Sequence, residues 1–166
     1  MFLILDVGSG NRPKGDVNTD LHIEATFHRG TNESINVKMS QNFVKADCLH
    51  LPFKDNAFRI VLASHVIEHV QMPEQVILEL LRVSSYKVIL KCPHKFFSKR
   101  HKSHVNHFNC TWFTSLGKKL CVNCEVSISR WRGLPFDVFA VVRLPYELTV
   151  AIYKNMKVCD FSNHTN

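Results

Sequence analysis

The sequence lacks the features of a membrane-spanning or secreted protein. No apolar run approaches the roughly 20 residues that a helix needs to cross a bilayer, and no basic region precedes the short apolar run at the amino terminus, as a secretory signal would require. The six cysteines are scattered through a chain that is 45% hydrophobic, so a core can form without disulfides and we expect free thiols. We therefore expect a cytoplasmic protein with one domain, 1–159, and a frayed polar tail at 160–166.

Acidic residues are in the minority. Lys and Arg outnumber Asp and Glu by 21 to 14, which gives a net charge of +7, and ten histidines add further charge below neutral pH. Such a balance favours an acidic partner or substrate such as RNA, DNA, phospholipid or a sugar nucleotide, and it equally serves solubility alone.

Short apolar runs alternate with helical patterns through the first two thirds of the chain. Strands are predicted at 2–6, 16–20, 43–46, 58–63, 87–92, 125–130 and 137–144, and helices at 73–82, 112–120 and 146–153. Thr111 is the expected N-cap of the second helix. This order predicts an α/β fold with a mostly parallel sheet and helices on both faces. Because 131–135 is too short for a crossover helix, the last two strands must pair antiparallel if they are neighbours.

Glycine is scarce, with six in the chain, yet two stand close together in Asp6-Val7-Gly8-Ser9-Gly10 at the end of the first strand. Glycine adopts positive φ without penalty and leaves room for a ligand beside the backbone. Asp6, Asp20 and Asp47 each close one of the first three strands, and open α/β sheets bind ligands at that edge. A carboxylate there can accept two ribose hydroxyls, although each Asp alone could simply cap a turn.

Two common nucleotide motifs are missing. A dinucleotide fingerprint needs a third glycine and a long helix, but only nine residues separate Gly10 from Asp20. A phosphate-binding P-loop needs Gly-Lys-Ser/Thr, which does not follow the glycine turn. A nicotinamide oxidoreductase is therefore a weak alternative.

Three motifs follow one another along the chain: LDVGSGNRP with GDVNTDL at 5–21, DCLHLPFKDNAF at 47–58, and SHVIEHV at 64–70. They resemble those of class I S-adenosylmethionine (SAM)-dependent methyltransferases, in the compact type-11-like branch with a shortened first crossover. The sequence departs from the family at Asn11, where a third glycine is usual, at Arg59, where Asp is usual, and at 84–86, where Pro-Gly-Gly is usual.

The resemblance implies a Rossmann-like methyltransferase that uses SAM as its cofactor. Asp6, Gly8 and Gly10 would border the methionine part, Asp20 would bind the ribose, and Ser64 and His65 would lie beside the sulfonium. Asp47, Cys48 and Leu49 would flank the adenine, with Asp47 accepting from its amino group. The full expected cofactor-binding set is Asp6, Gly8, Gly10, Asn11, Asp20, Leu21, Asp47, Cys48, Leu49, Ser64 and His65.

Methyl transfer from a sulfonium is a direct displacement, so the protein mainly supplies position. A base is needed only for a nucleophile that arrives protonated, and His65, Glu68 and His69 are the candidates. A structural role fits equally well, with Glu68 as an acid in the first turn of a helix and His69 as a surface histidine.

The segment 95–102 carries four Lys or Arg and two Phe, types that contact phosphates and stack on bases. The expected substrate residues are Lys99, Arg100, His104 and His107, and a solvated loop is the alternative.

Six residues in the following part of the chain are metal-ligand types: His101, His104, His107, Cys110, Cys121 and Cys124. Their spacing matches no standard zinc finger, so we expect no metal.

Few residues precede the first expected strand, and the sequence has no large insertion that could cover the site. We therefore expect a macromolecular acceptor, such as RNA or another acidic polymer, a partner subunit or second copy over the site, or a lid from 21–41 and 94–110. The alternative function is a non-catalytic module of the same fold that holds RNA or a partner protein through its basic face.

Overall fold

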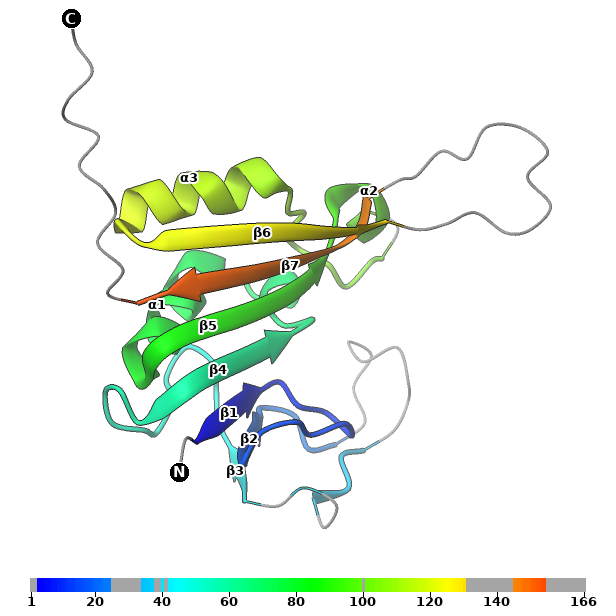
Figure 1. The fold of residues 1–166 in the computed structure, drawn as a ribbon. Coiled ribbons are helices and arrows are strands. Elements are labelled where there is room, and N and C mark those ends of the chain that lie inside the picture. Colours follow the sequence, from blue (N-terminus) through cyan, green and yellow to red (C-terminus); the bar gives the residue numbers. More distant parts are fainter. Residues whose placement is uncertain are drawn as a thin grey trace, which may run out of the picture.

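Seven strands form one mixed sheet in the order β3-β2-β1-β4-β5-β7-β6 (Figure 1). The computed structural model describes residues 3–24, 34–37, 40, 42–99, 101–130 and 145–154. The strands are β1 Ile4–Val7, β2 Val17–Asp20, β3 Phe43–Lys45, β4 Phe58–Ser64, β5 Ser84–Pro93, β6 Asn123–Arg130 and β7 Pro145–Tyr153. The first five are parallel, and β7 runs antiparallel to both β5 and β6. The predicted mostly parallel α/β sheet with an antiparallel C-terminal strand is confirmed.

Two helices of eleven residues each follow β4 and β5: α1 at Pro73–Val83 and α3 at Cys110–Leu120. Pro73 begins α1 where its missing N–H is not needed. The cap of α3 differs from the prediction, because the Asn109 side chain accepts the Trp112 N–H at 2.9 Å. Thr111 lies inside the first turn instead. Two shorter elements, η3 Ile67–His69 and α2 Lys95–Ser98, lie in the loops after β4 and β5.

Both long helices pack on the same face of the sheet. Val88 and Leu90 of β5 stand opposite Ile152 and Val150 of β7, and all four are buried in one cluster with the apolar residues of α1 and α3. Ile89, between them, points to the other face and is only half-buried. In the described ranges no helix of comparable length covers that face, because the first crossover has only nine residues. A helix on that face stays a prediction, since 25–33, 38–39 and 41 lie outside the described residues.

The C-terminal assignments also need correction. The segment predicted as a helix at 146–153 is the strand β7. Its buried residues Leu148, Val150 and Ile152 repeat every second residue, which is the period of a strand. The predicted strand at 137–144 and the tail at 160–166 lie outside the described residues. Among those described, no helix is long and apolar enough to cross a membrane.

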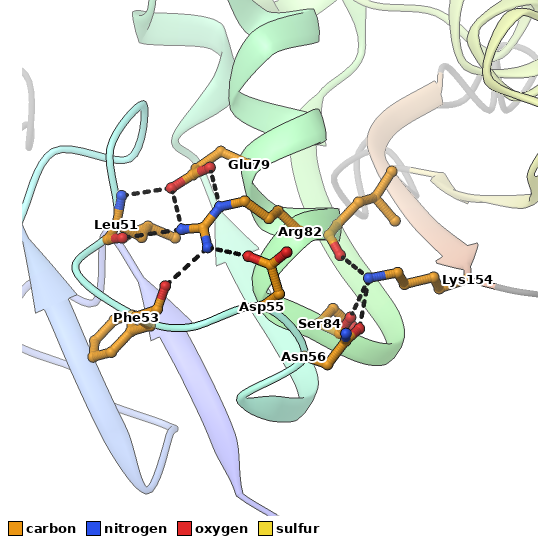
Figure 2. A network of polar contacts seen from close by, with 9 residues as sticks. Leu51, Phe53, Asp55, Asn56, Glu79, Arg82, Ser84 and Lys154 are labelled. Atoms are coloured by element: carbon orange, nitrogen blue, oxygen red, sulfur yellow. Dashed lines mark hydrogen bonds and ion pairs between the residues drawn. The ribbon is translucent and has the colours of Figure 1, made fainter.

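An ion-pair network joins the loop after β3 to helix α1 (Figure 2). Arg82 Nε donates to Glu79 Oε2 at 2.7 Å, and its Nη1 donates to Asp55 Oδ1 at 2.7 Å and to the Phe53 carbonyl at 2.9 Å. Glu79 Oε1 in turn accepts the Leu51 N–H at 2.7 Å. These hydrogen bonds, first that from Arg82, lower the pKa of Glu79. The network fixes the segment 51–55, which follows the end of β3, against helix α1.

A second cation holds the end of α1. Lys154, just after β7, donates from Nζ to the carbonyl oxygens of Leu81 at 3.0 Å and Ser84 at 3.1 Å, and to Asn56 Oδ1 at 2.7 Å (Figure 2). A positive charge at a helix C-terminus also interacts favourably with the helix dipole. Lys154 thus ties the last described strand to the helix and the loop beside it.

Candidate active site

A cleft of about 820 Å³ lies at the carboxyl ends of the parallel strands. Its walls come from the ends of all five, including the point between β1 and β4 where the strand order reverses, and open α/β sheets bind ligands there. The lining residues are Asp6, Val7, Gly8, Ser9, Gly10, Asn11, Arg12, Lys14, Asp20, Leu21, His22, Ala46, Cys48, Ser64, His65, Val66, His69, Val70 and Lys91. The volume is in the range typical of small-molecule and cofactor sites.

The glycine turn forms the floor between β1 and β2. Gly8 and Gly10 have φ values of 70° and 54°, a region that favours glycine. The N–H groups of Gly8 and Ser9 both donate to the Thr19 carbonyl, at 2.8 and 3.0 Å. A Cβ on Gly8 would lie 2.4 Å from Val66 Cγ2, so this glycine is also needed for space.

The short first crossover folds back along β1. Asp16 Oδ2 accepts a hydrogen bond from the Ile4 N–H at 2.8 Å, and the Asp16 N–H donates to the Ile4 carbonyl at 2.8 Å. Gly15 lies so close that an added Cβ would be 2.7 Å from the Asp6 N atom. The Lys14 N–H donates to Asp6 Oδ2 at 2.9 Å, while burial raises the pKa of Asp6. No helix is needed to connect these two parallel strands.

Asp20 lies at the end of β2, as predicted, and is anchored by two backbone groups. Its Oδ2 accepts from Gly10 N at 3.1 Å and its Oδ1 from His22 N at 3.0 Å. A carboxylate only accepts hydrogen bonds, through two oxygens, so its chemistry suits recognition of hydroxyl groups. Asn11, in place of the usual third glycine, binds the backbone of Ser34 and Asn36 at 3.1 and 2.9 Å.

Only part of the expected adenine-binding group lines the cleft. Cys48 does, and burial raises its pKa to about 12, so the thiol is neutral at physiological pH. Asp47 and Leu49 are absent from the lining. The Asp47 carboxylate accepts the Leu49 N–H at 2.9 Å and thereby shapes the turn that presents Cys48.

A histidine–glutamate pair stands after β4. His65 has a φ of 57°, its N–H donates to the Lys91 carbonyl at 2.8 Å, and its half-exposed ring lines the cleft. Its Nδ1 lies 3.1 Å from Oε1 of Glu68, whose side chain is 0% exposed. A carboxylate only accepts, so Nδ1 carries a proton and donates it toward Glu68.

Of the other residues predicted from the sequence, some line the cleft and some do not. His69 lines the cleft and its ring meets that of His104, with centroids 4.8 Å apart. Burial lowers the pKa of His104. His107 is exposed and binds Ser98 Oγ through Nδ1 at 2.9 Å. Lys99 is exposed and absent from the cleft lining, and Arg100 lies outside the described residues.

Several lining residues were not predicted from the sequence. Arg12, Lys14 and Lys91 add positive charge to a cleft that also holds Asp6 and Asp20. The buried Ser9 Oγ has no hydrogen-bond partner, so a polar ligand group would satisfy it. Arg12 and Lys14 stand within the glycine turn, and that position could have identified them. Lys91 could not be predicted in this way, because its place in the cleft depends on the face of the sheet to which β5 directs its side chain.

The residues present fit SAM, which has an amino acid part, a ribose and an apolar-faced base. Cations and an unpartnered hydroxyl line the glycine turn, the Asp20 carboxylate ends β2, and Ala46 and Cys48 provide an apolar wall. The cleft therefore has suitable partners for each part of that molecule.

The fold of the chain is that of class I SAM-dependent methyltransferases, and its cleft lies at the carboxyl ends of the parallel strands. Residues 17–87 match the family described as a methyltransferase domain. A SAM-dependent methyltransferase of Thermotoga maritima superposes with a TM-score of 0.66 at 16% identity, covering 91% of this chain and 81% of its own. The magnesium protoporphyrin IX methyltransferase of Synechocystis, solved with bound S-adenosylhomocysteine (SAH), gives 0.57 at 11% identity and coverages of 92% and 74%.

One curated relative also aligns with the chain. An uncharacterized protein of Methanocaldococcus jannaschii is 39% identical over 74 residues. The alignment covers 42% of this chain and only 30% of that protein's length. The family match and the fold support SAM as the cofactor.

Proposed function

We propose that this chain transfers a methyl group from SAM to an acceptor held beside His65. The observation that carries the proposal is the cleft at the strand ends, where the glycine turn and Asp20 lie on one side and the His65–Glu68 pair lies on the other. When bound, SAM supplies an electrophilic methyl group on a sulfur that leaves as a neutral thioether.

The protein residues hold and orient the reactants. Asp20 accepts the ribose hydroxyls, Arg12 and Lys14 attract the methionine carboxylate, and Ser9 offers its hydroxyl to the same end. Cys48 and Ala46 pack against the adenine. Asp47 and Leu49 act through the turn that positions Cys48.

His65 serves as general base for an acceptor that arrives protonated. Glu68 is a positioning residue, because its hydrogen bond to Nδ1 leaves Nε2 to receive the proton as the new bond to carbon forms. The backbone bond from His65 N to the Lys91 carbonyl fixes the ring at the end of β4.

The acceptor is an acidic macromolecule, with RNA as the favoured class. The net charge of +7 and the cationic segment that includes Lys99 and Arg100 support this choice. His104 and His107, on the same segment, stay predicted substrate residues. A partner subunit or a second copy over the cleft also stays a prediction, which light scattering can test.

Calorimetry with SAM and SAH tests the cofactor site. Asp20→Asn should raise the Kd about 10- to 100-fold, since one charge-assisted hydrogen bond is worth about 1.5–3 kcal/mol. Glu125→Gln on the exposed edge of β6 is the matched control and should leave the Kd unchanged. No binding of either compound, or equal Kd values for the two variants, contradicts the assignment.

Transfer of labelled methyl groups into RNA, protein and lipid fractions tests the reaction. His65→Gln should lower kcat about 100-fold or more without changing the SAM Kd, whereas His50→Gln, an exposed histidine absent from the cleft lining, should have no effect. Neutralising Lys99, Arg100 and Lys102 should weaken RNA binding and leave cofactor binding intact. Cofactor and RNA binding without transfer to any fraction would favour the non-catalytic module.

A further inference from the structure

The histidine-rich segment after α2 is fastened to η3. The N–H groups of Val105 and Asn106 both donate to the Glu68 carbonyl, at 2.9 and 3.1 Å. Asn106 Nδ2 donates to the Val70 carbonyl at 2.6 Å and approaches that of Ile67 at 3.3 Å. These bonds bring His104 beside Glu68 and His69, although more than 30 residues of sequence separate them.

Glu68 holds an unsatisfied acceptor inside this cluster. Its side chain is 0% exposed, and while Oε1 lies against His65, Oε2 has no hydrogen-bond partner. An unpartnered buried carboxylate oxygen is costly. Its chemistry calls for a proton donor or a cation at that position.

Both neighbouring histidines have one ring nitrogen already engaged. His69 Nδ1 lies 3.0 Å from the Ser103 carbonyl, and His104 Nδ1 lies 3.0 Å from Ser98 Oγ and 3.2 Å from the Ser98 carbonyl. These contacts through Nδ1 orient both rings beside Glu68. Metal-binding histidines are typically oriented by this kind of outer hydrogen bond.

We propose that Glu68, His69 and His104 form a binding site for Zn²⁺ or a similar divalent transition-metal ion at the edge of the cleft. One donor atom from each residue lies within 4.8 Å of the others. In a tetrahedral zinc site with bonds of about 2.0–2.1 Å, donor atoms lie roughly 3.3 Å apart, so the side chains close in slightly around the ion. Two histidines and one carboxylate leave a fourth position for water or another ligand, as in many catalytic zinc sites.

This site differs from the set of histidines and cysteines in 101–124 that the sequence alone offers as metal-ligand types. Within the described part of the chain, neither Cys121 nor Cys124 belongs to a cluster of three potential ligands. Cys121 is the exposed C-cap of α3, and burial raises the pKa of Cys124 to about 11, away from the thiolate that zinc prefers. Both cysteines can therefore serve as controls.

Titration of the chelator-stripped protein with Zn²⁺, and with Co²⁺ for its visible absorption, tests the proposal. We expect one ion per chain, a d–d spectrum of a four- or five-coordinate complex, and a Kd at least about 100-fold weaker in His104→Ala and in Glu68→Gln. The exposed His101 ring stacks on His104, and His101→Ala and Cys121→Ser should both bind as the unsubstituted chain does.

Parallel measurements keep the outcomes separate. Circular dichroism and SAM calorimetry on each variant show that it folds and that the cofactor site is intact, so the metal result does not depend on methyl transfer. Absence of Zn²⁺ and Co²⁺ binding to the folded chain, unchanged affinity in both His104→Ala and Glu68→Gln, or loss of binding in Cys121→Ser would each overturn the proposal.

Discussion

Replacing Gly8 with alanine should destabilise the protein far more than the same change at Gly10. Both glycines have positive φ, and holding an alanine there costs about 1–2 kcal/mol. At Gly10 no heavy atom lies within 4 Å of the added Cβ, so the backbone term is the whole cost. At Gly8 the Cβ would lie 2.4 Å from Val66 Cγ2, and displacing that side chain adds about 1–3 kcal/mol. The free energy of unfolding should fall by about 2–5 kcal/mol for Gly8→Ala.

Urea unfolding, followed by the fluorescence of the core-packed Trp112, measures these differences. The double variant Gly8→Ala/Val66→Ala removes both Cγ methyls and should recover the steric part. A double-mutant cycle should therefore give a coupling of about 1–3 kcal/mol between the two positions. Equal losses at Gly8 and Gly10, or strictly additive effects in the cycle, would refute the steric argument.

Three further predictions concern the contacts that hold helices α1 and α3. The pKa of Glu79 is lowered in the folded state, so its contribution to stability is present above the ordinary value of 4.5 and is lost as pH falls below it. Arg82→Met should flatten that dependence in thermal unfolding at pH 7 and pH 4, and an unchanged pH profile would count against the network. Asn109→Ala should cost about 1 kcal/mol in chemical denaturation, whereas Thr111→Ala should be near neutral, and the reverse order would restore Thr111 as the cap. Lys154→Met should lower the free energy of unfolding by about 1–2 kcal/mol, with the exposed Lys54→Met as its control, and equal stabilities would show that the bonds to α1 contribute little.

The sheet could largely be predicted from the sequence because most of its strands are short apolar runs with polar ends. The assignment of 146–153 as a helix was wrong for a physical reason. Leu148, Val150 and Ile152 alternate with less buried residues, and the buried partners on β5 that fix this alternation come from distant sequence. The α3 cap was misplaced by two residues because Asn109 and Thr111 are both good N-caps and only the backbone geometry selects one.

The cleft was predictable where it follows from strand order alone. Asp6 and Asp20 had to converge with the glycine turn once their strands were parallel neighbours. The contacts of Glu68 could not be predicted, since they depend on the packing of His65 and of the segment around Asn106. The clustering of His69 with His104 depends on the same packing, which no local spacing encodes.

The nine-residue first crossover also predicts an order in which the parts of the cleft assemble during folding. Loop-closure entropy grows with the logarithm of loop length, so pairing β1 with β2 costs about 1.5 kcal/mol less than pairing β1 with β4 across 50 residues. Proteins rich in local contacts fold faster than those dominated by distant pairings, so we expect the β1–β2 pair to form before the β1–β4 pair. The glycine turn and Asp20 can therefore meet within the first 20 residues of the chain. The wall that carries His65 is added only when β4 docks against β1.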